Sequence, residues 1–155
     1  MNTILAGNTV PGLSGKDQSG NTISLSQFKG RKVVLFFYPE DDTPTCTKEA
    51  CNLRDNYGLL KSKGLEVIGV SIDNETSHQK FIGKYDLPFP LIADEDKTWV
   101  EAYGAWGEKN MYGKKYMGTH RVTFLINEEG VISHVIKKVK SDNHAQQILD
   151  LLGLS

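Results

Sequence analysis

Two long apolar runs, 33–38 and 65–72, are separated by a segment with helical periodicity. Each run is typical of a strand that is covered on both faces of a sheet. Between them, small and apolar residues recur at spacings of three and four, which predicts a helix from Pro44 to Lys63 that stops at Gly64. A strand, a helix and a second strand in this order predict a parallel pair joined by a right-handed crossover.

The rest of the chain alternates in the same way between extended and helical patterns. Turn residues at Gly20-Asn21 and at 127–130 lie beside apolar segments, which predicts a hairpin near each end of the chain. Together the elements predict an α/β fold with a central mixed sheet flanked by helices, and the absence of repeats and linkers predicts one domain over residues 1–155. The expected segments are 22–25, 121–126 and 131–136 as strands, and 75–85, 97–103 and 143–152 as helices.

Charge and hydropathy narrow the classes of function. The formal net charge is −1, so the chain lacks the basic balance of a nucleic-acid-binding protein. No apolar stretch approaches the roughly 18–20 residues that cross a bilayer, which argues against a membrane protein. The first residues lack the charged and apolar regions of a signal peptide, so the expected location is the cytoplasm.

The only cysteines in the sequence are Cys46 and Cys51. In the cytoplasm such a pair is more often catalytic, redox-sensing or metal-binding than structural. Structural zinc requires four Cys or His ligands with short paired spacings, and the histidines are scattered, so we expect neither a metal nor another cofactor. Cys46 falls on the apolar face of its helix, where a cysteine is usually a small core residue, and that reading is the alternative to a chemical role.

The surroundings of Cys46 favour chemistry. Pro44 suits the first helical position, and Thr43 is then the N-cap residue, with its hydroxyl directed at the amide of Cys46. Unpaired first-turn amides and the positive end of the helix dipole favour a thiolate and leave donors for an incoming oxygen. Neighbouring anions oppose this effect, so we expect a cation from elsewhere in the fold. The anions are Asp41, Asp42 and Glu49.

At these residues the sequence resembles a known family. Pro39, Thr43 and Cys46 match Pro-x-x-x-Thr-x-x-Cys, the active-site signature of peroxiredoxins. The run Phe-Tyr-Pro-x-Asp-Asp-Thr-Pro-x-Cys-Thr-x-Glu-Ala-Cys is similar to the bacterioferritin comigratory protein (peroxiredoxin Q) branch. The resemblance continues into segment 121–126, and it departs at Thr45, where glycine is expected. It implies a thioredoxin-like fold.

The resemblance also implies an activity, namely the reduction of hydrogen peroxide or an alkyl hydroperoxide in antioxidant defence. Cys46 would attack the O–O bond and become a sulfenic acid. Cys51 would resolve it as an intramolecular disulfide, which thioredoxin or a similar dithiol protein would reduce. The remaining implied roles are Thr43 positioning the peroxide, Arg121 supplying the cation, Pro39 shielding the site from water and Glu49 orienting Arg121.

Helix geometry constrains the implied disulfide. Residues i and i+5 of an ideal α-helix have Cα atoms about 8.6 Å apart, whereas a disulfide needs about 7 Å or less. The helix between Cys46 and Cys51 must therefore unwind when they bond. Three other readings stay open: a redox-sensing interaction protein with the same switch, Cys51 as a bystander, and Arg121 as a surface ion-pair partner. The chain is expected to be a monomer or a weak homodimer.

Overall fold

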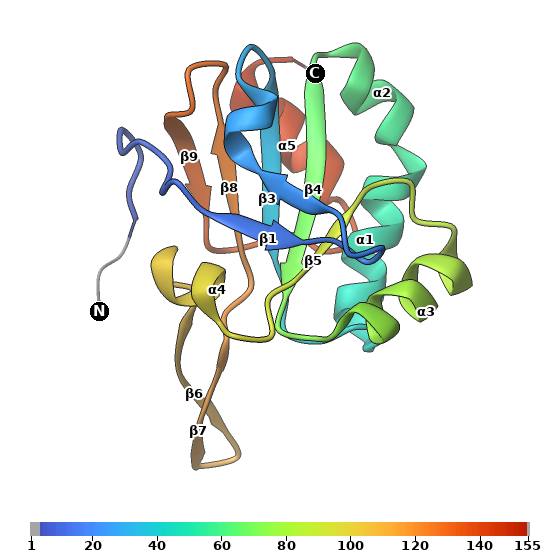
Figure 1. The fold of residues 1–155 in the computed structure, drawn as a ribbon, viewed down its shortest axis with the longest axis vertical. Helices are drawn as coiled ribbons and strands as arrows, with labels where there is room; N and C mark the ends of the chain where they lie inside the picture. Colours follow the sequence, from blue (N-terminus) through green and yellow to red (C-terminus); the bar gives the residue numbers. More distant parts are fainter. Residues whose placement is uncertain (1–3, 155) are drawn as a thin grey trace.

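A five-stranded mixed sheet forms the centre of the computed structural model, which describes residues 4–154 and leaves residues 1–3 and 155 of the expected domain outside the described range. The strand order is β5 (Leu91–Ala93), β4 (Leu65–Ser71), β3 (Lys32–Phe37), β8 (Val122–Ile126), β9 (Ile132–Ile136). The first three strands are parallel, and β8 and β9 run antiparallel to their neighbours (Figure 1). The predicted mixed sheet and the parallel crossover pair are confirmed.

Helices pack on one face of this sheet, where Phe36 of β3 lies in one core with Leu53 and Ile148. Alternate strand residues such as Leu35 point to the opposite face and pack with Trp99. The first face is covered by α1 (Pro44–Asp55), α2 (Tyr57–Ser62), α3 (Glu75–Tyr85) and α5 (His144–Leu152) (Figure 1). The second is covered by the hairpin of β1 (Ser14–Lys16) and β2 (Thr22–Ser24), by a 3-10 helix (Leu25–Phe28) and by α4 (Thr98–Ala102).

The continuous helix predicted from Pro44 to Lys63 is wrong, because the chain breaks at Asn56 into α1 and α2. The side chain of Asn56 donates a hydrogen bond to the carbonyl of Asn52 at 2.9 Å. That carbonyl would otherwise accept the Asn56 amide, so the side chain competes with the helix. The second helix still stops before Gly64, whose φ of +82° suits glycine.

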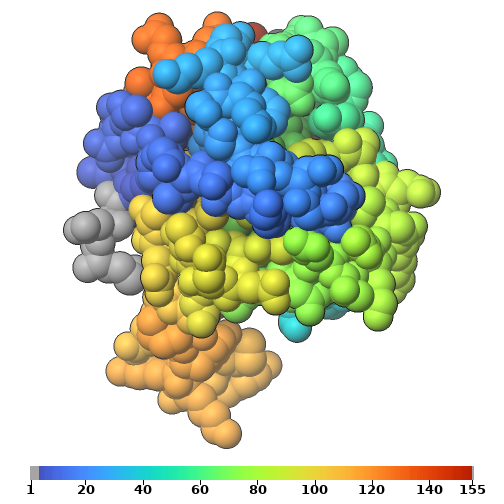
Figure 2. All heavy atoms as spheres, in the orientation of Figure 1, coloured from blue at the N-terminus to red at the C-terminus, as the bar shows by residue number. Residues whose placement is uncertain are grey.

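The hairpin of β6 (Trp106–Met111) and β7 (Lys114–Thr119) was not predicted. It stands out from the body of the molecule, and its outer side chains are largely exposed (Figures 1 and 2). Without a buried face, the hairpin lacks the alternation of apolar and polar residues that identifies a strand. It matters for the site because β7 leads directly into Arg121. No helix among residues 4–154 is long and apolar enough to cross a membrane.

Candidate active site

Cys46 lies in the first turn of α1, directly after the loop that leaves β3, and is 2% exposed. Thr43 is the N-cap residue, as predicted, and Pro44 opens the helix. The predicted hydrogen bond from the Thr43 hydroxyl to the helix is wrong, because Thr43 Oγ1 donates to the carbonyl of Glu40 at 3.0 Å. Among residues 4–154, no side chain caps α1, which leaves its first-turn amides for an incoming oxygen.

Arg121 lies beside Cys46, where we expected a cation. It precedes β8, whose first residue, Val122, is paired with Phe37 at the end of β3. This antiparallel pairing brings Arg121 to a cysteine 75 residues away, with Nη2 donating to Sγ of Cys46 at 3.2 Å. Burial lowers the pKa of Arg121, but Glu49 and Cys46 raise it further, so the guanidinium stays charged.

Glu49 binds the second terminal nitrogen of the Arg121 guanidinium. Nη1 of Arg121 donates to Oε1 of Glu49 at 2.7 Å, and the carboxyl group is completely buried. Burial raises the pKa of Glu49 to about 7, although the charge and hydrogen bond of Arg121 lower it. The planar guanidinium therefore bridges Cys46 and Glu49, in a geometry that a lysine ammonium cannot reproduce.

Cys51 lies on the same helix, five residues beyond Cys46, and is half-buried. Both thiols are free, and the helix is continuous between them. Burial raises the pKa of the Cys51 thiol, more than the nearby charge of Arg54 lowers it. The implied pairing with Cys46, and the unwinding that it requires, stay predictions.

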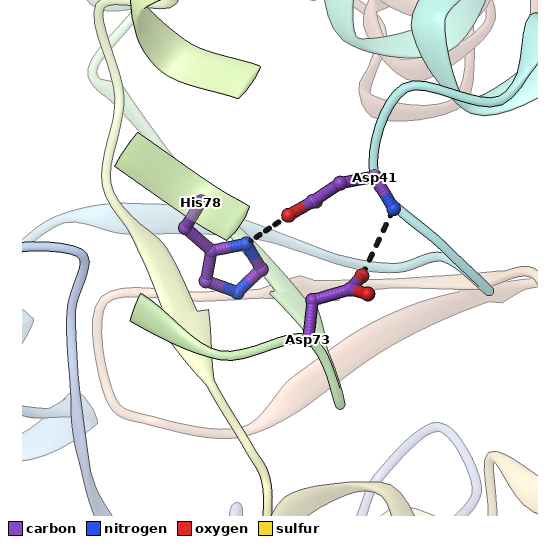
Figure 3. A group of neighbouring side chains, drawn as sticks. All are labelled: Asp41, Asp73 and His78. Atoms are coloured by element: carbon purple, nitrogen blue, oxygen red, sulfur yellow. Dashed lines mark hydrogen bonds and ion pairs between the residues drawn. The ribbon is translucent and has the colours of Figure 1, made fainter. Parts of the chain in front are cut away.

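The loop before Cys46 is anchored by a buried hydrogen-bond network (Figure 3). The carboxylate of Asp41 accepts from the hydroxyl groups of Tyr38 at 2.6 Å and Ser77 at 2.7 Å, and it contacts Nδ1 of His78 at 2.7 Å. Asp73 accepts the amide of Asp41 at 2.9 Å. The carboxylate of Asp41 is thus compensated by partners in this network and not by the groups around the Cys46 thiol.

The next residue, Asp42, is fixed in a similar way. Its carboxylate accepts from Nζ of Lys84 and from the hydroxyl of Tyr85, both at 2.8 Å. These partners on α3 lower the pKa of Asp42 and hold a backbone with φ of +58°, a conformation that is uncommon outside glycine. The loop that carries half-buried Pro39 and Thr43 is therefore tied to α3 at two successive residues.

Asp41, Asp73 and His78 also offer three ligand atoms within 4.8 Å of one another. Both ring nitrogens of His78 face acceptors, however: Asp41 on Nδ1 and the carbonyl of Ile92 on Nε2 at 2.9 Å. Burial lowers the pKa of His78, but Asp41 raises it further, so the ring favours two donor nitrogens. Such a ring has no lone pair for a metal ion, and the cluster acts as an anchor of the loop.

Two residues that the sequence did not single out also belong to the site. Nζ of Lys109 on β6 donates to the carbonyl of Thr119 at 2.9 Å. Burial and the charge of Arg121 lower the pKa of Lys109 while Cys46 raises it, so the ammonium interacts electrostatically with both groups. His144, at the start of α5, is fully buried with Nε2 3.5 Å from Oε2 of Glu49.

A thiol at a helix N-terminus beside an arginine is typical of redox enzymes that act through a thiolate. The family model described as AhpC/TSA family matches residues 6–135. A putative peroxiredoxin bcp of Coxiella burnetii is 48% identical over 97% of this chain and 99% of its own length. Peroxiredoxin Bcp of Escherichia coli K12 is 43% identical over 98% and 97%. The chain therefore belongs to the AhpC/TSA family, and it is a thiol peroxidase.

Solved structures agree with this assignment. A cysteine-to-serine mutant of PrxQ from Xylella fastidiosa superposes with a TM-score of 0.90 at 28% identity, covering 99% of this chain and 97% of that one. A bacterioferritin comigratory protein of Xanthomonas campestris, described for its alkyl peroxide reduction activity, gives 0.85 at 35% identity over 91% and 90%. The predicted thioredoxin-like peroxiredoxin fold is confirmed.

Proposed function

We propose that Cys46 is the peroxidatic residue and that the substrates are hydrogen peroxide and organic hydroperoxides. The thiolate attacks the terminal oxygen, an S–O bond forms as the O–O bond breaks, and the products are a sulfenic acid and an alkoxide or hydroxide. The leaving oxygen takes one proton to become alcohol or water. The contact of 3.2 Å between Arg121 and Sγ carries this proposal, because it places a fixed cation on the attacking atom.

The neighbouring groups have distinct parts in this step. Arg121 and the free first-turn amides of α1 stabilise negative charge on the peroxide oxygens. The Thr43 hydroxyl already donates to Glu40, so it meets the peroxide as an acceptor of the O–H group. Pro39 limits access of water to the thiolate.

The second half of the cycle involves Cys51. Its thiol attacks the sulfur of the Cys46 sulfenic acid, a disulfide forms, and water leaves with the oxygen. A dithiol protein such as thioredoxin then reduces the disulfide in two exchange steps and is itself oxidised. Peroxide is thus reduced at the expense of a cellular dithiol, which is an antioxidant function.

We infer that residues 1–155 act as one domain in the cytoplasm, as a monomer or a weak homodimer, with no nucleic-acid partner. The two apolar cores on either side of one sheet support a single folding unit. The net charge of −1 supports the absence of a nucleic-acid partner.

Turnover distinguishes the peroxidase from a redox sensor. We expect peroxide-dependent oxidation of NADPH when the protein is mixed with thioredoxin and thioredoxin reductase, with both hydrogen peroxide and an alkyl hydroperoxide as substrates. Repeated turnover supports the enzyme. A single stoichiometric oxidation of the thiols, with no turnover on any dithiol reductant supplied, would instead assign the chain to the sensor class.

Replacing Arg121 by lysine tests the cation. Lysine keeps the charge, but it cannot bond Cys46 and Glu49 together. Since a hydrogen bond to a charged group contributes about 1.5–3 kcal/mol, we expect the rate constant for peroxide to fall roughly 10- to 100-fold. Stopped-flow kinetics measure it. Arg31→Lys is the matched control, because Arg31 also pairs with a glutamate but lies on the exposed surface. Equal rates in both variants would remove Arg121 from the proposed role.

A further inference from the structure

The carboxyl group of Glu49 is unevenly partnered. Oε1 accepts from Arg121 at 2.7 Å, but Oε2 is buried and, within residues 4–154, has no hydrogen-bond partner. Leaving a buried carboxylate oxygen unpaired costs free energy, since burial penalises the charged form. On the side away from Arg121, Nε2 of His144 lies 3.5 Å from Oε2. The protonation state of His144 therefore determines whether Oε2 is more stable as a carboxylate oxygen or as the hydroxyl of a carboxylic acid.

The tautomer of His144 follows from the side-chain amide of Gln147. The amide nitrogen of Gln147 donates to the carbonyl of Lys138 at 2.9 Å, so its oxygen is the end that accepts the amide of Lys140 at 3.0 Å. The same oxygen lies 2.9 Å from Nδ1 of His144 and can only accept. Nδ1 must therefore carry hydrogen.

The other ring nitrogen is an acceptor. Burial lowers the pKa of His144 to about 4, so the ring carries one proton near neutral pH, and that proton is on Nδ1. Nε2 then has a single lone pair, which lies 2.8 Å from the hydroxyl oxygen of Thr123 and 3.5 Å from Oε2 of Glu49. A carboxylate oxygen and a nitrogen lone pair repel each other, whereas a carboxylic acid proton between them is attracted to both.

The charges around Glu49 lead to the same result. On its own helix, Cys46 is a second acidic group, and both share the guanidinium of Arg121. From β6, the ammonium of Lys109 interacts electrostatically with Arg121 and Cys46. From α5, the neutral ring of His144 adds no positive charge. The ammonium of Lys109 donates to the carbonyl of Thr119, so an ionised Cys46 and an ionised Glu49 would compete for the guanidinium of Arg121. A single proton on Glu49 removes this competition.

We propose that Glu49 is a neutral carboxylic acid in the reduced protein, with its proton on Oε2 directed at Nε2 of His144, so that the charge of Arg121 is left to the Cys46 thiolate. His144 is then a positioning residue for the carboxyl group of Glu49. This inference rests on the proposed role of Cys46 as the attacking thiolate, and it specifies how that thiolate keeps its cation.

The proposal also balances the chemical step. Thiolate, hydroperoxide and the Glu49 acid become sulfenic acid, alcohol and the Glu49 carboxylate. One O–O bond breaks and one S–O bond forms. The proton lost by Glu49 balances the proton that the leaving oxygen gains. Arg121 exchanges a thiolate partner for a carboxylate partner, so the charge of the site is the same before and after oxidation.

Infrared difference spectra of the whole protein at about pH 6, below the pKa of about 7, test the charge of Glu49. We expect a C=O band of a protonated carboxyl that is absent from Glu49→Gln and that is lost from the wild type on treatment with peroxide. Glu66→Gln is the matched control and keeps the band, because Glu66 also pairs with an arginine but lies outside the site. If Glu49→Gln removes a carboxylate band instead, the proposal is overturned.

Kinetics give a second and independent readout. Because the pKa of Glu49 is raised to about 7, its carboxylate competes for Arg121 at higher pH, and we expect the wild-type rate constant for peroxide to bend downward there. The bend disappears in Glu49→Gln. A bend that persists in that variant, or a larger thiolate fraction than in the wild type at about pH 6, means that Glu49 was already ionised below its pKa of about 7 and contradicts the proposal.

A direct titration covers the case in which Glu49→Gln does not fold. NMR of the glutamate carboxyl carbons in the wild-type protein should show one group titrating near pH 7, and exclusively low values would overturn the inference. Failure of the proposed function is distinguishable from failure of the inference. If Cys46→Ser retained peroxide turnover, Cys46 would lose its role, whereas the infrared and NMR signals would still report the charge of Glu49.

Discussion

We expect Cys46→Ser to lose peroxide turnover, with a decrease of roughly 10⁴-fold or more in the rate constant, as is typical when an enzyme loses its nucleophile. A serine hydroxyl is not ionised near neutral pH, so Arg121 has no anion to stabilise at that position. The measurement is peroxide consumption with thioredoxin and its reductase, followed through NADPH. The size of the side chain is nearly unchanged, and the completely buried core residues Ala50 and Leu53 keep their packing.

Two controls make this result specific. The circular dichroism spectrum and the thermal unfolding midpoint of Cys46→Ser should match those of the wild type closely, because the substitution removes no apolar volume of consequence. Cys51→Ser, which retains the thiol in the first turn, should still consume one equivalent of peroxide. If Cys46→Ser turns over peroxide at the wild-type rate, the attacking group is elsewhere in the chain.

The sheet was predictable from sequence because burial on both faces leaves a local signature. In β3, the five residues from Val33 to Phe37 are all buried, and they read as one apolar run. Turn residues fixed the hairpin of β8 and β9, and Asn74 caps α3 through the amide of Ser77 at 2.8 Å. In each of these elements, the local pattern and the tertiary environment favour the same structure.

The break in the helix at Asn56 and the hairpin of β6 and β7 were not predicted for a common reason. The contacts that form them leave no periodic pattern of apolar residues in the sequence. Asn56 ends α1 by a side-chain hydrogen bond to Asn52, and Leu60 beyond the break keeps the helical spacing and is fully buried. The hairpin of β6 and β7 buries little, so apolar alternation is absent there. Its strands are held by pairing in register, from Trp106 with Thr119 to Met111 with Lys114.

The part of the candidate site that could be predicted is formed by residues close together in the sequence. Thr43 and Cys46 are close in sequence, and their positions at the N-cap and in the first turn of α1 were predicted, although the hydroxyl of Thr43 bonds to Glu40 and not to the helix. Arg121 entered through the need for a cation and through the family resemblance. Lys109 and His144 reach the site from β6 and α5 across the fold, and neither has a sequence neighbour that marks it.

A second large loss of turnover is expected when Cys51 is replaced. We expect Cys51→Ser to react once with peroxide at a rate close to that of the wild type, and then to lose thioredoxin-dependent turnover almost completely. The sulfenic acid on Cys46 has no resolving thiol, so it accumulates and is oxidised further by excess peroxide. Mass spectrometry after trapping of the sulfenic acid measures the first product. Sustained turnover with thioredoxin would show that Cys51 is not the resolving residue.

The same reaction requires α1 to change shape. Both cysteines lie inside one helix, Pro44–Asp55, and at their spacing of five residues the Cα atoms of an ideal helix are about 8.6 Å apart, beyond the limit of about 7 Å for a disulfide. The first turn is the part that can yield, because it has no side-chain cap, whereas Leu53 in the last turn is fully buried. Hydrogen exchange should therefore accelerate at the start of α1 on oxidation of the wild type, and not in Cys51→Ser. A Cys46–Cys51 disulfide formed with unchanged exchange throughout α1 would contradict this mechanism.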